Sequence, residues 1–360
     1  MADAPAPPAL EPTASIAALT RALCDIDSVS GNETRLADAI EAALRSASHL
    51  EVVRDGDAIV ARTTPGRARR VIVAGHIDTV AINDNLPVRE VDGFLIGRGT
   101  VDMKGGIAVA LKLALELTAP SVDVTWIFYD HEEVASELNG LGRLARHRPD
   151  LMMGDFAILC EPTSATVEGG CNGTARVEIR THGRRAHSAR SWVGVNAIHA
   201  LSPVLEILAA YEPQSVEVDG LIYREGLNAV GIAGGVAGNV IPDEAVVTVN
   251  YRFAPSRTAA DAIEHLERVF DGYEVVVTDI EEGARPGMDA PLAQEFLAAV
   301  GGVAHPKYGW TDVARFARLG IPAVNYGPGN ALLAHADDEA VAIAELEQCE
   351  QGLRAWLSAP

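Results

Sequence analysis

The sequence predicts an α/β protein, in which a doubly wound mixed sheet forms one domain and a smaller α+β domain is inserted into it. Three apolar segments, VIVAG, VDVTWIFY and DFAIL, are typical of buried strands and alternate with segments of helical periodicity. Further along, the alternation gives way to several strands separated by two helices. We therefore predict a first domain at residues 1–172 and 283–360, and an inserted domain at residues 173–282.

The amino-terminal part is expected to be mainly helical. After a segment rich in Pro and Ala at residues 1–14, residues 15–24 show helical apolar spacing with Ser15 as the N-cap. A second amphipathic helix is predicted at residues 33–47. Short strand-like runs follow at residues 50–53 and 58–62, and they lead into the first core strand.

Glycines mark the passage from a strand into the next long helix. In GFLIGRGTVDMKGG, Asp102 falls in the loop between them, and the helix is expected to begin near Gly106. The loop matches neither the GxxxxGK[ST] spacing of a phosphate loop nor the GxGxxG of a dinucleotide turn. Phosphate binding is therefore disfavoured.

The insert is predicted to contain two helices among its strands. Strand TARVEIRTHG leads through the basic loop RRAHSARSW to a helix at residues 195–210. Strands LNAVGIAGGV and AVVTVNYRFA, a helix at residues 259–270 and strand YEVVVTDI complete it. The chain then returns to the first domain through a helix after Pro291, and the last helix is predicted at residues 341–357.

Composition restricts the function. A net charge of −21 repels phosphate backbones and anionic lipid, which excludes nucleic acid and membranes as expected partners. Apolar runs stay short of the roughly 20 residues that a membrane helix needs. The start MADAPAPPALEP lacks the basic and apolar regions of a signal peptide, so the cytoplasm is the expected location. The four cysteines show no CxxC spacing and are expected to be reduced thiols packed in the core.

Acidic residues follow the predicted strands, and histidines stand at the first strand and near the end of the chain. Ligands in α/β sheets bind beyond the carboxyl ends of the strands, so these side chains are expected to meet there. The charge of two divalent cations is balanced by three carboxylates and a bridging hydroxide, and two imidazoles complete the set of ligands. Nitrogen and oxygen donors favour zinc, and cobalt or manganese can substitute for it. The candidate metal ligands are His76, Asp102, Glu133, Glu161 and His335.

Three of the acidic residues have more specific expected roles. Asp78 lies two positions after His76 on an extended segment, so it can reach one ring nitrogen while the other faces the metal. Asp102, on a glycine-rich loop, is the candidate bridging ligand. Glu132, beside Glu133, is the candidate general base toward the attacking water. An isolated HxD also occurs where a strand simply ends in polar residues, so the prediction rests on the whole set.

The motifs GHIDTV, GRGTVDMKGG, HEE, CEPT and a late His resemble those of the zinc aminoacylase and carboxypeptidase family, which includes acetylornithine deacetylase and carboxypeptidase G. The segments GRRAHSARSWVGVNAIHA, REGLNAVGIAGGVAGNVIPDEAVVTVNYRFAPSR and KYGWTDVARFARLGIPAVNYGPG are similar to its actinobacterial members that hydrolyse N-succinyl-diaminopimelate. The resemblance extends from residue 16 to the end of the chain.

The resemblance implies roles for individual residues. It gives the same five ligands with Asp102 bridging, Asp78 orienting His76, Glu132 as base and a cis peptide after Asp102. It implies that the insert is a lid and dimerisation domain, and that His187 reaches across a homodimer to stabilise the oxyanion. His131 departs from the Asp that many members have there. Further residues match family positions near the substrate, namely Arg252, Asn239, Thr311, Arg315 and Asn330.

Several of these residues also have ordinary interpretations. His187 lies in a basic loop where a histidine is often only solvated, and Arg252 lies in a strand where an arginine often faces solvent. Asparagine and threonine in loops commonly serve turns. For Arg252 the functional interpretation is favoured, because a substrate with several carboxylates needs a planar, two-pronged donor.

The resemblance implies a metal-dependent amidohydrolase that cleaves N-succinyl-LL-2,6-diaminopimelate to succinate and LL-2,6-diaminopimelate, in lysine biosynthesis. The expected substrate is thus a small anionic N-acyl amino acid. An alternative is another N-acyl amino acid deacylase, such as an acetylornithine deacetylase, or a dipeptidase. A metal-dependent binding protein without catalysis is the alternative from a different class, and it is disfavoured because Glu132 and Asp78 accompany all five ligands.

Overall fold

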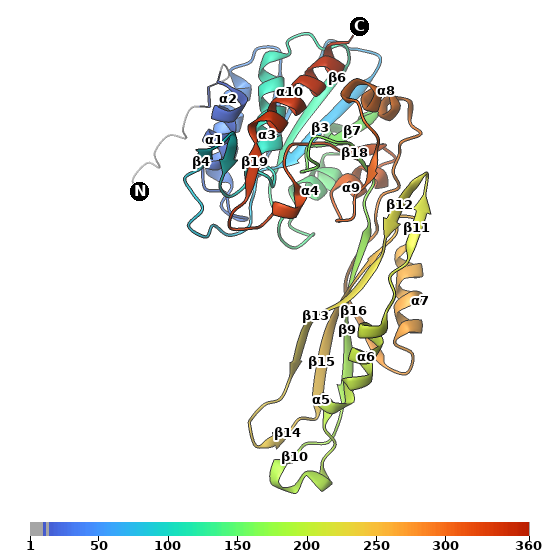
Figure 1. Ribbon diagram of the computed structural model, residues 1–360. Coiled ribbons are helices and arrows are strands. Elements are labelled where there is room, and N and C mark those ends of the chain that lie inside the picture. Colours follow the sequence, from blue (N-terminus) through green and yellow to red (C-terminus); the bar gives the residue numbers. More distant parts are fainter. Residues whose placement is uncertain (1–9, 12–13, 360) are drawn as a thin grey trace. The chain divides into compact units, whose positions relative to one another are not determined.

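The computed structural model describes residues 10–11 and 14–359, and these form two compact units (Figure 1). Unit 1 comprises Met1–Gly169, Gly287–His305 and Arg315–Pro360, and unit 2 comprises Gly170–Pro286 and Pro306–Ala314. The division falls within a few residues of the predicted one. It also adds the short segment Pro306–Ala314 to the insert, which the sequence analysis did not predict.

Unit 1 is built on an eight-stranded mixed sheet. β3, β6, β7 and β18 pair in parallel, while β1, β2 and β8 pair with their neighbours in antiparallel fashion. The predicted doubly wound mixed sheet is therefore confirmed. The strand order is β1 (Glu51–Asp55), β2 (Ala58–Arg62), β6 (Asp123–Tyr129), β3 (Arg70–His76), β7 (Phe156–Leu159), β18 (Ala323–Asn325), β8 (Glu168–Gly169) and β17 (His305–Pro306).

The central strands are apolar throughout because both of their faces are buried. In β3, Val71 and Val73 join a core cluster, and the alternate residues Ile72 and Ala74 are equally buried on the other face. Five helices contribute to that cluster: α1 (Ile16–Cys24), α2 (Thr34–Arg45), α3 (Lys104–Glu116), α8 (Pro291–Val300) and α10 (Ile343–Ser358). Two further helices are α4 (Gly140–His147) and α9 (Val313–Arg318).

Two predicted helices of unit 1, α1 and α3, begin at or near their predicted first residues. The Ser15 side chain accepts a hydrogen bond from the Ala18 amide at 3.2 Å, which confirms it as the N-cap of α1. The helix predicted near Gly106 begins slightly earlier, at Lys104. Gly106 then lies inside α3, where a Cβ atom would stand 2.1 Å from the Cys160 carbonyl oxygen. This glycine therefore serves close packing of the helix on the end of β7.

The last predicted helix was placed two residues too early. Ala340–Ala342 form β19, which pairs with β5 (Phe94–Ile96) in a three-stranded sheet completed by β4 (Arg89–Val91). Val341 is fully buried opposite Leu95, and an apolar residue at that place suits a strand as well as a helix. Short 3-10 helices, η1 (Pro149–Leu151) and η3 (Ala331–Leu333), complete unit 1.

Unit 2 contains an antiparallel sheet in the order β13 (Gly226–Gly234), β15 (Glu244–Phe253), β9 (Gly173–His182) and β16 (Glu274–Glu281). Residues of β9 alternate between buried and more exposed, so one face of the sheet forms a core and the other is polar. The core is shared with the helices of this unit, α5 (Ala197–Ala200), α6 (Ser202–Ala210) and α7 (Ala259–Val269) (Figure 1).

The single helix predicted at residues 195–210 is wrong, because α5 and α6 are separated at Leu201. Pro203 explains the break, since it donates no backbone hydrogen bond and its ring clashes with the preceding turn. Asn196 caps α5, and its side chain accepts from the Ile198 amide at 2.9 Å. The remaining elements are β10 (Ala186–His187) paired with β14 (Val240–Ile241), β11 (Ser215–Val218) paired with β12 (Leu221–Arg224), and η2 (Ser188–Val193).

No helix among residues 10–11 and 14–359 is long and apolar enough to cross a membrane.

Candidate metal centre

The centre lies in unit 1, where the parallel strands end. His76 is the last residue of β3 and stands opposite Tyr129, the last residue of β6. On the other side of β3, Ala74 pairs with Leu159 of β7. His76 stands two residues after Ala74, and Glu161 stands two residues after Leu159. The register of the strands therefore brings both residues to the same edge of the sheet. Both side chains are buried.

Asp102 is the residue on which the two histidines converge. Its Oδ1 lies 3.2 Å from His76 Nε2, and its Oδ2 lies 3.3 Å from His335 Nε2. His335 Nε2 also lies 3.0 Å from Glu133 Oε1. Ligand atoms of His76, Asp102 and Glu133 all lie within 4.8 Å of one another. One carboxylate that faces two imidazoles through different oxygens has the arrangement expected of a bridging ligand.

Asp78 connects His76 to the turn that carries the two glutamates. The Nδ1 atom of the His76 ring lies 3.0 Å from the backbone oxygen of Asp78 and 3.5 Å from its carboxylate. That carboxylate accepts hydrogen bonds from the amides of Glu132 and Glu133, each at 3.0 Å, and from the Ser30 hydroxyl at 2.7 Å. Asp78 therefore contacts the His76 ring, more closely through its backbone carbonyl than through its carboxylate, and its orienting role stays a prediction.

The centre attracts positive charge. Burial of the His76 ring opposes its protonation, but hydrogen bonds to Asp102 and Asp78 outweigh burial and raise its pKa well above the usual value. Contacts with Asp102 and Glu133 raise the pKa of His335 to about 10. Burial acts to raise the pKa of Asp102, yet its hydrogen bonds from His335 and His76 hold the pKa below its usual range. A divalent cation would meet the same carboxylates.

His131 is paired with acidic residues outside the predicted donor set. Its Nδ1 lies 2.8 Å from Asp130 Oδ2 and 3.3 Å from Glu33 Oε1, and its backbone φ is +60°. The Asp130 carboxylate also accepts from both Nη atoms of Arg143, at 2.8 and 3.1 Å. The backbone amide and the imidazole of His131 are thus both held by carboxylates, at the residue before Glu132.

The predicted substrate residues are divided between the units. In unit 2, His187 is exposed at η2, where its Nδ1 accepts from the Ala189 amide at 3.1 Å, and exposed Asn239 accepts from the Ser188 amide through its backbone oxygen at 2.9 Å. Arg252 lies on the polar face of β15, where its Nε donates to Asn250 Oδ1 at 3.1 Å. Burial and nearby Arg176 lower the pKa of Arg252.

Thr311, also in unit 2, is buried, and its carbonyl accepts from the Ala314 amide. In unit 1, Arg315 donates from Nη2 to the Ser136 hydroxyl at 2.9 Å, on the loop that follows the two glutamates. Asn330 caps η3, and its Oδ1 accepts from the Leu332 amide at 3.0 Å. The ordinary turn role therefore applies to Asn330, and the catalytic role of His187 and the substrate roles of the other five residues stay predictions.

Two residues beside the donors escaped the sequence analysis. Glu339 is buried, and its Oε1 accepts from the Asp102 amide at 3.0 Å, while Arg98 is paired with its other oxygen at 2.8 Å. Glu339 follows two other acids in ADDE, which is typical of an exposed turn. The one sequence signal was the arginine of GRGTVD, beside the Asp102 loop. The peptide between Asp102 and Met103 is cis, as the resemblance implied.

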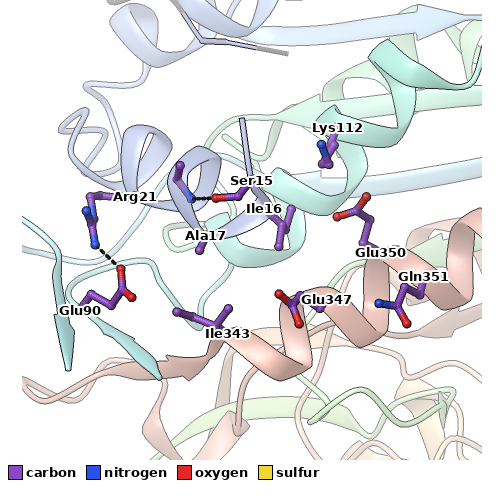
Figure 2. A pocket seen from close by; sticks show the side chains of 11 residues that line it. Ser15, Ile16, Ala17, Arg21, Glu90, Lys112, Ile343, Glu347, Glu350 and Gln351 are labelled. Carbon is purple, nitrogen blue, oxygen red and sulfur yellow. Dashed lines mark hydrogen bonds and ion pairs between the residues drawn. The ribbon is translucent and has the colours of Figure 1, made fainter. Parts of the chain in front are cut away.

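A separate cavity of unit 1 lies between α1 and α10 (Figure 2). Arg21, Lys112, Glu347 and Glu350 are among the residues that line it, and Arg21 is bound to Glu90 at 2.8 Å. None of its lining residues belongs to the predicted donor set. The cavity therefore does not serve as the predicted catalytic site.

The residues present fit divalent metal ions. Imidazole nitrogens and carboxylate oxygens are the donors preferred by zinc and by metals that replace it. Three donors from strand β3, the Asp102 loop and the turn after β6 already lie close enough to share one ion. A mixed α/β sheet with such a donor set beyond its strand ends fits a metal-dependent hydrolase.

Comparisons with known proteins identify the family. Residues 72–359 match the model of peptidase family M20/M25/M40. The chain is 54% identical over 342 residues to a Mycobacterium tuberculosis protein named provisionally as a succinyl-diaminopimelate desuccinylase, covering 94% of this chain and 97% of that protein. It is 46% identical over 351 residues to the succinyl-diaminopimelate desuccinylase of Corynebacterium glutamicum, covering 94% and 95%.

Solved structures show the same fold. A Staphylococcus aureus tripeptidase matches with a TM-score of 0.78 at 20% identity, covering 98% of this chain and 99% of that one. The Bacillus subtilis protein YXEP, described as a dinuclear metal-binding peptidase, matches with a TM-score of 0.68 at 19% identity, covering 95% and 96%. The chain belongs to peptidase family M20/M25/M40 and is a hydrolase, as predicted.

Proposed function

We propose that this chain hydrolyses N-succinyl-LL-2,6-diaminopimelate to succinate and LL-2,6-diaminopimelate, which places it in lysine biosynthesis. The observation that carries the proposal is the 46% identity, over nearly the full length of both chains, to a protein named for this reaction. The 54% identity to the Mycobacterium tuberculosis protein supports it. The paired contacts of Asp102 support a bridged donor set.

His76, Asp102, Glu133, Glu161 and His335 would hold two divalent ions, with zinc as the first choice. The dinuclear metal binding of YXEP supports the number, since the two chains share the fold. When bound, the ions supply Lewis acidity toward the amide carbonyl and the attacking water. Every other step falls to the protein's own groups.

Glu132 is the proposed general base. Asp78 holds the amide of Glu132 and faces the His76 ring, which supports a fixed placement of the Glu132 backbone beside the donors. Glu132 would take one proton from the water molecule as the water oxygen attacks the amide carbon. It would then return that proton to the nitrogen of the leaving amine. The C–N bond then breaks to give a carboxylate and an amine, so the reaction consumes one water.

Unit 2 is the proposed lid and dimerisation domain. β13 lies at one edge of its sheet, and Val230 and Ile232 on this strand are 59% and 61% exposed. An edge strand that presents apolar side chains is suited to pairing with a second copy. Ile232→Lys should yield monomers in light-scattering measurements, whereas Val303→Lys, at a 73% exposed position of unit 1, should leave the dimer intact.

His187 is proposed to stabilise the oxyanion across the dimer. Mixing subunits is a direct test, because Glu132→Gln and His187→Ala chains should each be inactive alone. A mixed dimer would contain one site with an intact base and an intact partner histidine, so activity should return to about a quarter of wild type. If mixing restores no activity while mixed dimers form, His187 does not act in trans.

The substrate itself is tested with one zinc-loaded preparation. N-succinyl-diaminopimelate should be hydrolysed with the highest kcat/KM, above N-acetylornithine and a dipeptide. A preference for either of the latter would replace this proposal with another N-acyl amino acid deacylase or a dipeptidase. The cytoplasm is the proposed compartment, and the four free, buried cysteines support it.

A further inference from the structure

Arg98 and Glu339 form a buried ion pair behind the metal centre. Arg98 Nη1 lies 2.8 Å from Glu339 Oε2, and the side chains are only 4% and 1% exposed. A buried pair is costly to desolvate and is not by itself a gain in stability over apolar residues. Its position therefore calls for an account other than stability alone.

Glu339 holds the backbone of the Asp102 loop. Its Oε1 accepts from two successive amides, those of Val101 at 2.8 Å and Asp102 at 3.0 Å. The Gly97 amide donates to the Glu339 backbone oxygen at 2.9 Å. The loop that carries the proposed bridging ligand is thus fixed to Glu339 at both ends. These hydrogen bonds involve no side chain of a proposed metal ligand.

Arg98 holds the backbone beside His335. Its guanidinium donates to the His335 carbonyl at 3.4 Å and to the Ala336 carbonyl at 3.3 Å. Its Nε also donates to the Ala81 carbonyl at 3.2 Å, in the segment that follows Asp78. His335 has φ +65°, in the left-handed region that non-glycine residues adopt only where their surroundings hold them. The Arg98 contacts provide such surroundings.

We propose that Arg98 and Glu339 are positioning residues, a buried clamp that sets the distance between the Asp102 and His335 loops before any metal binds. The two loops are more than 230 positions apart in sequence. Each carries one proposed ligand, and each is held by one member of the pair. The clamp acts on backbone only, so neither residue needs to touch metal or substrate. The inference rests on the proposed function for its kinetic part alone.

A matched control exists in the same unit. Arg70 and Asp123 form a partly buried pair at 3.0 Å, with side chains 18% and 6% exposed. They begin β3 and β6, whereas His76 ends β3, so this pair lies at the opposite end of the strands. Asp123→Asn should lower the stability of unit 1 without reaching the metal centre.

The experiment compares Glu339→Gln, Arg98→Lys and Asp123→Asn with wild type. Glu339→Gln keeps the size of the side chain, but its amide NH2 group must face either Arg98 or the backbone N–H groups. Arg98→Lys keeps the charge but lacks the planar guanidinium that donates to several acceptors at once. In both clamp variants we expect zinc affinity to fall by about 10- to 100-fold, as for other residues that orient ligands. The visible absorption spectrum of the cobalt form should change, and kcat should fall with little change in KM.

Asp123→Asn should lose thermal stability yet keep the wild-type zinc affinity and cobalt spectrum. If the clamp variants behave in the same way, the pair is merely structural and the proposal is overturned. Zinc affinity and the cobalt spectrum require no substrate. A wild-type enzyme that ignores N-succinyl-diaminopimelate would therefore defeat the proposed function and leave this test standing.

Should the clamp variants fail to fold, hydrogen exchange on the wild-type protein decides the matter. The amides of Val101 and Asp102 donate to Glu339 rather than to a metal ligand. They should be protected from exchange in the metal-free protein as strongly as in the zinc form. Rapid exchange of both amides until zinc is added would show that the metal, not the pair, orders the loop.

Discussion

The carboxylate of Asp78 accepts a hydrogen bond from the backbone amide of Glu132 at 3.0 Å. Asp78 lies just beyond β3 and Glu132 just beyond β6, so one side chain links the ends of two adjacent parallel strands. Burial acts to raise the pKa of Asp78, but the neighbouring His76 lowers it to about 2. Asp78 therefore remains a hydrogen-bond acceptor near neutral pH, and it contacts both the His76 ring and the backbone of Glu132, the proposed base.

Replacing Asp78 by Asn tests this coupling. One oxygen becomes an amide donor that faces a backbone amide or the His76 ring, so the turn must shift. Zinc affinity should fall by about 10- to 100-fold, and kcat should fall with it. Zinc affinity measured by chelator competition, together with kcat, checks this. Ser30→Ala removes a single hydroxyl donor and should have a smaller effect, and a wild-type zinc affinity in Asp78→Asn would argue against an orienting role.

Replacing Glu132 by Gln separates catalysis from metal binding. The side chain keeps its size but can no longer accept the proton of water, so kcat should fall by about 100- to 10,000-fold. The zinc content measured by atomic emission should stay at the wild-type value. Glu137→Gln changes an exposed glutamate of the same loop and should be fully active. Unchanged turnover in Glu132→Gln would refute the proposed base.

Chelation of the metal should lower stability as well as activity. Asp102 and Glu133 lie within 4.8 Å of each other, and bound cations offset their repulsion. An ion present at about 100 times its Kd would contribute about 2.7 kcal/mol to the free energy of unfolding. We expect the Tm to fall by about 5–10 °C when a chelator is added. An unaltered Tm, in a preparation shown to have lost its metal, would contradict this.

The stability of unit 2 should decrease in mild acid because of His265. Burial and nearby Arg257 lower the pKa of His265, whose Nε2 lies 3.1 Å from the Tyr211 hydroxyl. As the pH falls, His265 is protonated in the unfolded chain, at about pH 6.5, before it is protonated in the folded protein. The free energy of unfolding therefore decreases below about pH 6.5 and does not depend on this histidine above it.

Urea unfolding at two pH values, one above and one below about 6.5, measures the change in the free energy of unfolding. His265→Gln should show a smaller loss of unfolding free energy between them than wild type does. Glu225 and Arg268, the other charged groups that act on this ring, are present in both proteins. An equal loss in the two proteins would assign the acid sensitivity to other residues.

The four cysteines should resist thiol reagents in the folded protein. Each is at most 1% exposed, and burial raises the pKa of Cys24 to about 12 and of Cys171 to about 11. A neutral, inaccessible thiol reacts slowly. Titration with a chromogenic disulfide should detect all four thiols in denaturant and only a slow reaction, limited by unfolding, in buffer. One fast equivalent in buffer would contradict this burial.

Local pattern was enough for the central elements. VIVAG, VDVTWIFY and DFAIL could be identified as buried strands because strands covered on both faces are apolar throughout. The prediction of a single helix at residues 195–210 was wrong. The apolar periodicity continues across Pro203, but the helix is interrupted there. β19 was missed since three residues that include Val341 give too short a pattern to separate a strand from a helix.

By itself the sequence determined the family and the identity of the candidate donors, because His76, Asp102, Glu133, Glu161 and His335 stand in motifs whose types and order indicate metal chemistry. Tertiary structure alone decided that Asp102 meets both histidines and that Glu339 and Arg98 are buried behind it. The reason is physical. Arg98 and Glu339 are buried against segments more than 230 positions away in the sequence, and no local pattern records such contacts.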